Sequence, residues 1–151
     1  MTAFESIISE MAAATGLPLE IDEKDACSVE ADGIITTIQY RRDKDDVTIF
    51  SLVEEEADEA KCRAALKLSL HGKGTDGNFI GLFDGGIVMS TFMPLEGLTA
   101  ETLGARLLSF ADTALQVRSA IEAEEGKPAQ EVDASVEGSS FDFSNFSAIR
   151  V

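Results

Sequence analysis

The chain has 151 residues, of which 44% are hydrophobic, and it carries a formal net charge of −16. This length and composition fit one globular domain with a sizeable core and exclude wholesale disorder. Phosphate contacts need clustered Lys and Arg, so we expect no nucleic-acid binding. No apolar stretch approaches membrane-spanning length, so we expect no membrane insertion. The acidity suits either plain solubility or a partner with basic segments.

The first half of the chain predicts one helix followed by a meander of three strands. Apolar residues at helical spacing predict a helix over residues 3–15, with Thr2 as its N-cap and Gly16 at its end. Alternating apolar residues then predict strands over 26–31, 34–40 and 47–53.

The next predicted helix, residues 57–70, is apolar on two opposite faces. One stripe contains Cys62, Leu66 and Leu70, and the other is mostly alanine. Small residues let a second backbone approach closely, so we expect the alanine stripe to form a homodimer interface. Its residues are Ala57, Ala60, Ala64 and Leu68.

The second half predicts a hairpin, with strands over 78–83 and 87–93, and a long final helix that starts at the N-cap Thr99 and runs to about residue 123. Hairpin strands separated by helices indicate an antiparallel sheet. We therefore predict an α+β fold with about five strands and three helices in the order α-β-β-β-α-β-β-α, forming a single domain over residues 1–123.

Residues 124–151 are predicted to be a flexible acidic tail with an aromatic C-terminal segment. Its large apolar residues are unusual for a disordered tail and mark a possible binding motif: Phe141, Phe143, Phe146 and Ile149. We expect this segment to occupy a groove of its own or a neighbouring subunit when no partner is bound. A frayed tail, or a docking motif for another protein, is the alternative.

Nothing in the sequence singles out a catalytic, cofactor-binding or metal-binding residue. Gly72, Gly74 and Gly77 match GxGxxG, but they follow a helix and precede a strand, which is the reverse of a dinucleotide site. The acidic runs lack EF-hand spacing. Two unpaired cysteines and an N-terminus unlike a signal peptide favour a cytoplasmic protein. We therefore expect no enzyme activity and no cofactor.

Large apolar residues that exceed the needs of the core predict a protein-binding surface. On the first helix these are Phe4, Ile8 and Met11, and on the strands they are Ile35 and Phe50. Packing of the helix residues against the sheet is the alternative for those three.

The chain resembles the type III secretion chaperones of the Tir-chaperone (CesT-like) family over roughly residues 3–123. The resemblance lies in an N-terminal helix ending in Gly16-Leu17, a third strand over 47–53, an Ala/Leu-rich middle helix and a Gly-rich hairpin over 78–90. An amphipathic last helix completes the pattern, and the tail departs from it.

This resemblance implies a cytosolic homodimer that binds the extended N-terminal segment of a secreted effector and performs no chemistry. The effector would lay apolar side chains into surface grooves and add strands to sheet edges. Two other functions stay open at this point. One is a bacterial sensory or adaptor protein of the same fold, and the other is a small enzyme that uses clustered carboxylates.

Overall fold

The computed structural model describes residues 1–123 and 142–149. The predicted linker and Phe141 lie outside these ranges. The described helices are α1 (Ala3–Thr15), α2 (Glu59–Ser69) and α3 (Ala100–Ala123), with 3₁₀ turns η1 (Leu70–Gly72) and η2 (Phe143–Asn145). The strands are β1 (Ala26–Ala31), β2 (Ile34–Arg41), β3 (Asp46–Glu54), β4 (Phe79–Phe83), β5 (Gly86–Pro94) and β6 (Phe146–Ala148).

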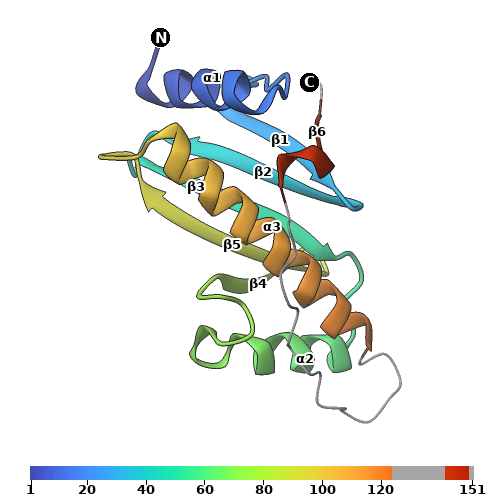
Figure 1. The fold of residues 1–151 in the computed structure, drawn as a ribbon. Coiled ribbons are helices and arrows are strands. Elements are labelled where there is room, and N and C mark those ends of the chain that lie inside the picture. The colour runs from blue at the N-terminus through green and yellow to red at the C-terminus, as the bar shows by residue number, and fades with distance from the viewer. Residues whose placement is uncertain (124–141, 150–151) are drawn as a thin grey trace.

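All strands pair antiparallel in one sheet of order β4-β5-β3-β2-β1-β6. The predicted α+β class and order of elements are confirmed, with six strands rather than about five. The additional strand is β6, which comes from the predicted tail. In Figure 1, α3 runs along the sheet, α1 lies near the β1 end and α2 lies near the β4 end.

Local sequence signals account for the ends of the helices and hairpins. Thr2 and Glu5 form a capping box at the start of α1, and Gly16 ends that helix with a φ of +74°. In the β1–β2 turn, Asp32 and Gly33 both have positive φ, as a two-residue turn that matches strand twist requires. These signals are short-range, which is why the sequence alone predicts them.

The core lies between one face of the sheet and the helices α1 and α3. Strand residues of alternating position point into it, and the helices contribute one stripe each. The thiol of Cys27 on β1 belongs to this inner face, and burial raises its pKa to about 12. Cys27 and Cys62 are both free thiols. The helices therefore cover most of the inner face, and the other face and the sheet edges are left for contacts with a partner.

Candidate functional site

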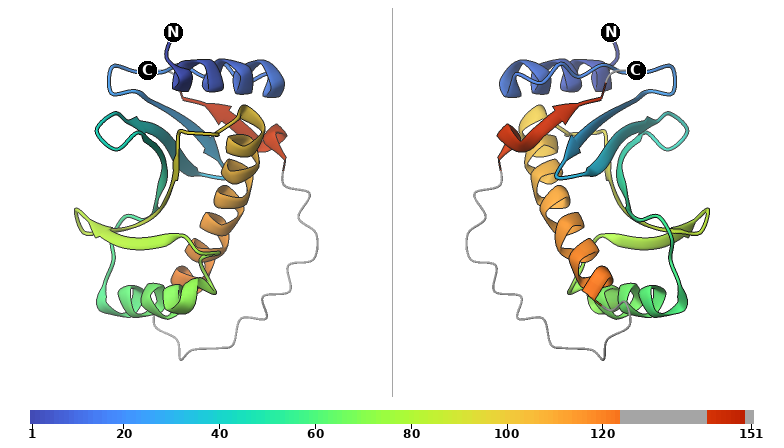
Figure 2. Two further views of the ribbon diagram at one scale, coloured as in Figure 1. Left: turned by 90° about the vertical axis from the view of Figure 1, so that its left-hand side faces the viewer. Right: turned by 90° about the vertical axis from the view of Figure 1, so that its right-hand side faces the viewer.

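The face of the sheet opposite α3 carries no helix among the described residues (Figure 2). We call this surface the outer face. It contains side chains from four neighbouring strands: Ile35, Phe50, Leu52, Phe79 and Phe92. Ile35, Leu52, Phe79 and Phe92 are each between 45% and 55% exposed. A row of half-exposed apolar side chains across a sheet is a surface suited to contact with another apolar surface.

The register of the strands brings these side chains together. Phe50 on β3 lies opposite Ser90 on β5, and Ser90 lies opposite Phe79 on β4. The rings of Phe79 and Phe92 are stacked, with 5.4 Å between centroids, and the Arg41 guanidinium lies 5.6 Å from the Phe92 ring centroid. The aromatic part of the outer face is thus ordered within the single chain. The predicted binding residues Ile35 and Phe50 both lie on this face.

The other three predicted binding residues, Phe4, Ile8 and Met11, are buried, with at most 2% of each exposed. The Phe4 ring stacks on Tyr40 of β2, with 5.6 Å between centroids. The expectation that these residues form a partner surface is therefore wrong for this structure, and the packing alternative holds. Packing against the sheet buries the apolar stripe of α1.

The predicted dimer stripe on α2 also faces mostly inward. Ala64 is 6% exposed, and Ala57 and Leu68 pack against the core, so only Ala60 of the four residues is exposed. Burial of Ala64 beneath α3 and the sheet contradicts its expected role as an outward contact. The outward apolar residues of α2 and its flank are those of the opposite stripe. Leu66 and Leu70 are 67% and 64% exposed.

The edge strand β4, next to α2, has two strongly exposed apolar residues, Leu82 at 67% and Phe83 at 74%. Phe83 lies opposite Gly86 and on the same face of the sheet as Phe79, whereas Leu82 points to the other face. We call Leu66, Leu70 and Leu82 together the α2–β4 surface. Among the described strands, β4 pairs on one side only, with β5. Its other side carries unpaired backbone groups that another strand can pair with. The α2–β4 surface therefore combines apolar side chains with a free sheet edge.

The opposite edge of the sheet is occupied by the end of the chain itself. Strand β6 pairs antiparallel with β1, with Phe146 opposite Ala31, and the Ile149 amide donates to the Ser28 carbonyl at 2.9 Å. Phe146 is 7% exposed, and Phe143 packs against the core. The sequence indicated that this segment is apolar but did not predict strand β6 or its pairing with β1. A strand of three residues is too short to give a periodic signal.

The turn before β6 is closed by an aspartate cap. The Asp142 carboxylate accepts hydrogen bonds from the amide and the hydroxyl of Ser144, and these bonds hold the pKa of that carboxyl below its usual value. The 3₁₀ turn η2 places Phe143 and Phe146 on the same side, because residues three apart eclipse in such a turn. Their ring centroids are 5.4 Å apart.

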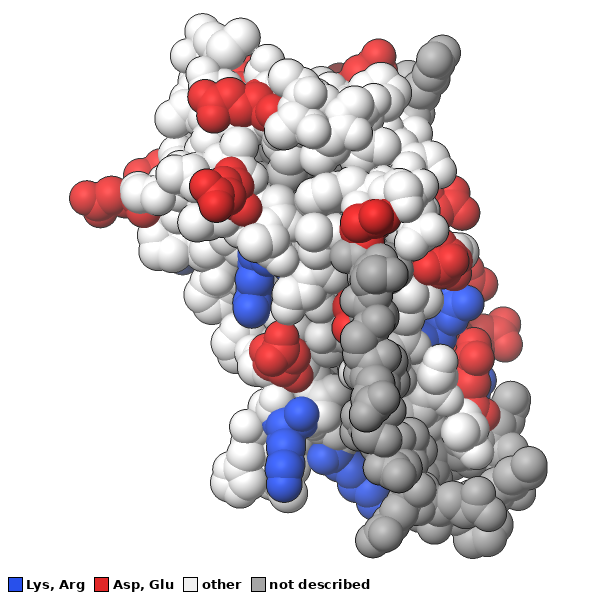
Figure 3. Space-filling model, viewed as in Figure 1, with Lys and Arg blue, Asp and Glu red and all other residues white. Residues whose placement is uncertain are grey.

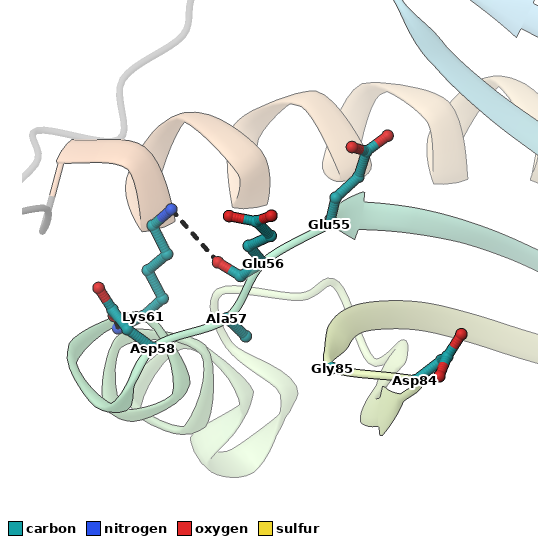
Figure 4. A pocket seen from close by; sticks show the side chains of 7 residues that line it. All are labelled: Glu55, Glu56, Ala57, Asp58, Lys61, Asp84 and Gly85. Atoms are coloured by element: carbon teal, nitrogen blue, oxygen red, sulfur yellow. Dashed lines mark hydrogen bonds between the residues drawn. The ribbon is translucent and has the colours of Figure 1, made fainter.

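A hollow of about 430 Å³ lies between the start of α2 and the β4–β5 turn (Figure 4). Its lining is largely acidic, and the one lysine there, Lys61, is 8% exposed. The Lys61 ammonium donates to the Glu56 carbonyl and lies 3.4 Å from a Glu54 carboxylate oxygen. These contacts tie the β3–α2 connection to the helix, which is a structural role.

The groups considered for chemistry are part of turns and ion pairs. Gly72 and Gly77 are joined by a backbone hydrogen bond of 2.9 Å, which closes the loop on itself. Asp46 accepts two hydrogen bonds from Arg41, which lower the pKa of the aspartate. Within residues 1–123 and 142–149, no group of three or more His, Cys, Asp or Glu is placed to hold a metal ion.

Charge is spread over the surface. On the face shown in Figure 3, acidic side chains are scattered over several elements, and the Lys and Arg side chains stand in separate places. In the part of the chain that the structure describes, no helix has the length and hydropathy needed to cross a membrane.

Comparison with known proteins identifies the fold. The model of the Tir chaperone protein (CesT) family matches residues 6–118, whereas no curated protein sequence matches the chain. A chain of the HopA1–SchA chaperone–effector complex shares 16% identity at a TM-score of 0.67, with 78% of this chain and 94% of that chain covered.

Two other solved structures have a similar chain. The ExsC–ExsE complex gives 19% identity and a TM-score of 0.60, covering 72% of this chain and 86% of that chain. The type III secretion chaperone SycH of Yersinia pestis, in complex with a stable fragment of YscM2, gives 17% identity and a TM-score of 0.59, covering 76% and 98%. At these identities the likeness establishes a shared fold.

Proposed function

This chain belongs to the Tir chaperone protein (CesT) family, and we propose that it is a type III secretion chaperone. In this proposal it binds an extended segment near the N-terminus of a secreted effector in the cytoplasm, as a homodimer and without catalysis. The solved structures of similar fold include chaperones in complex with effectors or with a protein fragment, which supports this choice.

The observation that carries the proposal is the outer face. Its apolar side chains are half-exposed on a sheet whose other face packs against helices. An extended segment presents side chains at the same spacing as a strand and can set apolar residues against such a surface. Because an effector segment is already extended, it need not unfold a core in order to bind.

Capture of an effector tests the proposal. The tagged chain, expressed in its native host, should retain a secreted protein, and limited proteolysis of the complex should leave a protected N-terminal segment of that protein. Replacing Ile35 and Phe92 together with aspartate should reduce capture at least tenfold, because charge replaces apolar contact at two separated points of the outer face. The matched control is Ile35→Val with Phe92→Leu, which keeps the surface apolar and should keep capture. Undiminished capture by the aspartate variant would contradict the role of the outer face.

The homodimer of this proposal uses the α2–β4 surface. Leu66 and Leu70 are large, apolar and about two-thirds exposed in the single chain, so a second copy would remove them from water. The free edge of β4 offers backbone pairing beside them. This replaces the inward-facing alanine stripe as the expected interface.

Replacing Leu66 and Leu70 with aspartate should convert a wild-type dimer into a monomer. Two added charges on each copy oppose association, whereas the exposed positions leave the fold of each copy intact. Light scattering measures the mass, and Leu66→Met with Leu70→Met is the matched control. A monomeric wild type, or a dimer that survives both aspartates, would rule out this interface.

A further inference from the structure

The segment 142–149 lies outside the residues that the family model matches, yet it completes the sheet. We propose that it is an internal substitute for a partner strand. It occupies the edge of β1 when no partner is bound. A partner segment that has a short strand after a turn, with two aromatic residues three positions apart brought to one side by that turn, displaces it. This inference rests on the proposed function, because it concerns how an extended segment gains access to the sheet.

The contacts of the segment are those of a bound peptide. Backbone pairing joins residues 146–148 to β1, and the amide of Ile149 continues it. Side-chain recognition comes from two rings, those of Phe143 and Phe146, set on the same side by the η2 turn. Main-chain pairing combined with a few apolar anchors is how sheet edges receive extended peptides.

Gly104 on α3 leaves the space in which the Phe143 ring packs. A methyl group added at Gly104 would lie 3.5 Å and 3.8 Å from two carbon atoms of the Phe143 ring. These are ordinary contact distances, so an alanine fits there, whereas a longer side chain would fill the space of the ring. Gly104 also lies in the interior of a 24-residue helix, where glycine is a poor helix former. The glycine thus leaves an opening in α3 at the place where an aromatic ring lies.

The connection to the rest of the chain permits this contact within one molecule. Residues 124–141 separate α3 from the segment. Along α3, Gly104 and Ala123 are about 28 Å apart at 1.5 Å per residue. A chain of this length covers as much as about 60 Å when fully extended, so the sheet edge is within reach. A tethered copy has an effective concentration on the order of 1 mM, high enough for a weak internal contact to form.

The contact is also small enough to be displaced. Only three residues form strand β6, and Phe146 is the single buried residue of the segment. If the segment occupies the edge in about 90% of molecules, a competing segment binds about tenfold more weakly than it would to a free edge. Occupation of the β1 edge by the segment therefore means that only a partner of sufficient affinity or concentration can bind there.

A labelled synthetic peptide of residues 139–151 serves as the probe in a test on the full chain. Fluorescence anisotropy measures its binding to the wild type and to the Phe143→Ser/Phe146→Ser variant. We expect the variant to bind the peptide at least tenfold more tightly, because its own segment no longer holds the edge. Ser147→Ala, at an exposed position of β6, is the control and should bind like the wild type.

Substitutions at Gly104 provide a second and independent readout. In the Phe143→Ser/Phe146→Ser chain, adding Gly104→Leu should abolish binding of the peptide, whereas adding Gly104→Ala should preserve it. Circular dichroism establishes that each variant is folded. Equal peptide affinity of the wild type and the double serine variant, or peptide binding that Gly104→Leu leaves intact, would overturn the inference.

The two proposals fail in different ways. Effector capture that is the same for the wild type and the Phe143→Ser/Phe146→Ser variant would overturn the inference and leave the proposed function standing. Peptide binding that follows the predicted order, with no effector captured by any variant, would leave the edge site standing and contradict the secretion role.

Discussion

Replacing Phe4 and Ile8 together with serine is expected to unfold most of the protein at room temperature. Both side chains are at most 2% exposed, between α1 and the sheet. Truncation of a buried phenylalanine costs about 3–5 kcal/mol and that of a buried isoleucine about 2–5 kcal/mol. The combined loss is comparable with the whole stability of a typical domain, which is about 5–15 kcal/mol.

Urea unfolding followed by far-ultraviolet circular dichroism measures this effect. The matched control is Ile35→Ser with Leu52→Ser, two apolar residues of the outer face that are 51% and 45% exposed. Because about half of each side chain is already in water, the control should retain a cooperative transition close to that of the wild type. A Phe4→Ser/Ile8→Ser chain with a wild-type midpoint would show that α1 does not pack as described.

Replacing Ala64 with arginine is expected to lower the stability by about 3 kcal/mol or more. Ala64 is 6% exposed where α2 faces the core, so the longer side chain overpacks this contact and places a charge beside apolar groups. For a chain of this length, the loss corresponds to a fall of roughly 10 °C in Tm.

Ala60→Arg is the matched control for this prediction. Ala60 lies one turn before Ala64 on the same helix, but it is exposed. The two variants therefore have the same composition and charge, and the arginine lies on the same stripe of α2 in both, at the exposed first turn in one and at the buried second turn in the other. Differential scanning calorimetry should give a large fall in Tm for Ala64→Arg and a small change for Ala60→Arg. Equal Tm values would mean that Ala64 is not buried where α2 meets the core.

The sequence predicts the elements of this fold well because their signals are local. The capping box at Thr2, the Asp32-Gly33 turn and the alternation along β3 each depend on neighbours within a few residues. The boundaries of β1 agree with the prediction residue for residue, and those of the other predicted strands agree to within one residue.

Which apolar face is buried is a different kind of question, and the sequence answers it less well. The helix α2 has two apolar stripes, and its neighbours in space decide which of them is covered. In the structure, the side of α2 that carries the small residues Ala64 and Ala65 is buried, whereas Leu66 is exposed. Close approach to α3 favours the small residues, so the alanines serve contact within the chain rather than between two chains.

The C-terminal segment shows more clearly that a local sequence pattern does not specify long-range contacts. Phe146 is separated from Ala31, its partner in the sheet, by more than 100 residues of chain. No local pattern specifies such a pairing, and the strand is too short to have a period of its own. The aromatic residues indicated that the segment has a binding surface. The place where it binds depends on Gly104 of α3 and on the edge of β1, which are distant in sequence.

The position of β6 also bears on how the protein avoids forming fibres. A sheet with two free edges can add copies at both ends, and repeated addition of that kind grows without limit. With β6 on β1, the two end strands of the described sheet are β4, with five residues, and β6, with three. Two copies that join through their β4 edges leave a β6 strand at each end, and so short an edge strand offers few backbone groups to a third copy. In the proposed homodimer, the short β6 strand would therefore act as a chain terminator, which stops assembly of the sheet at two copies.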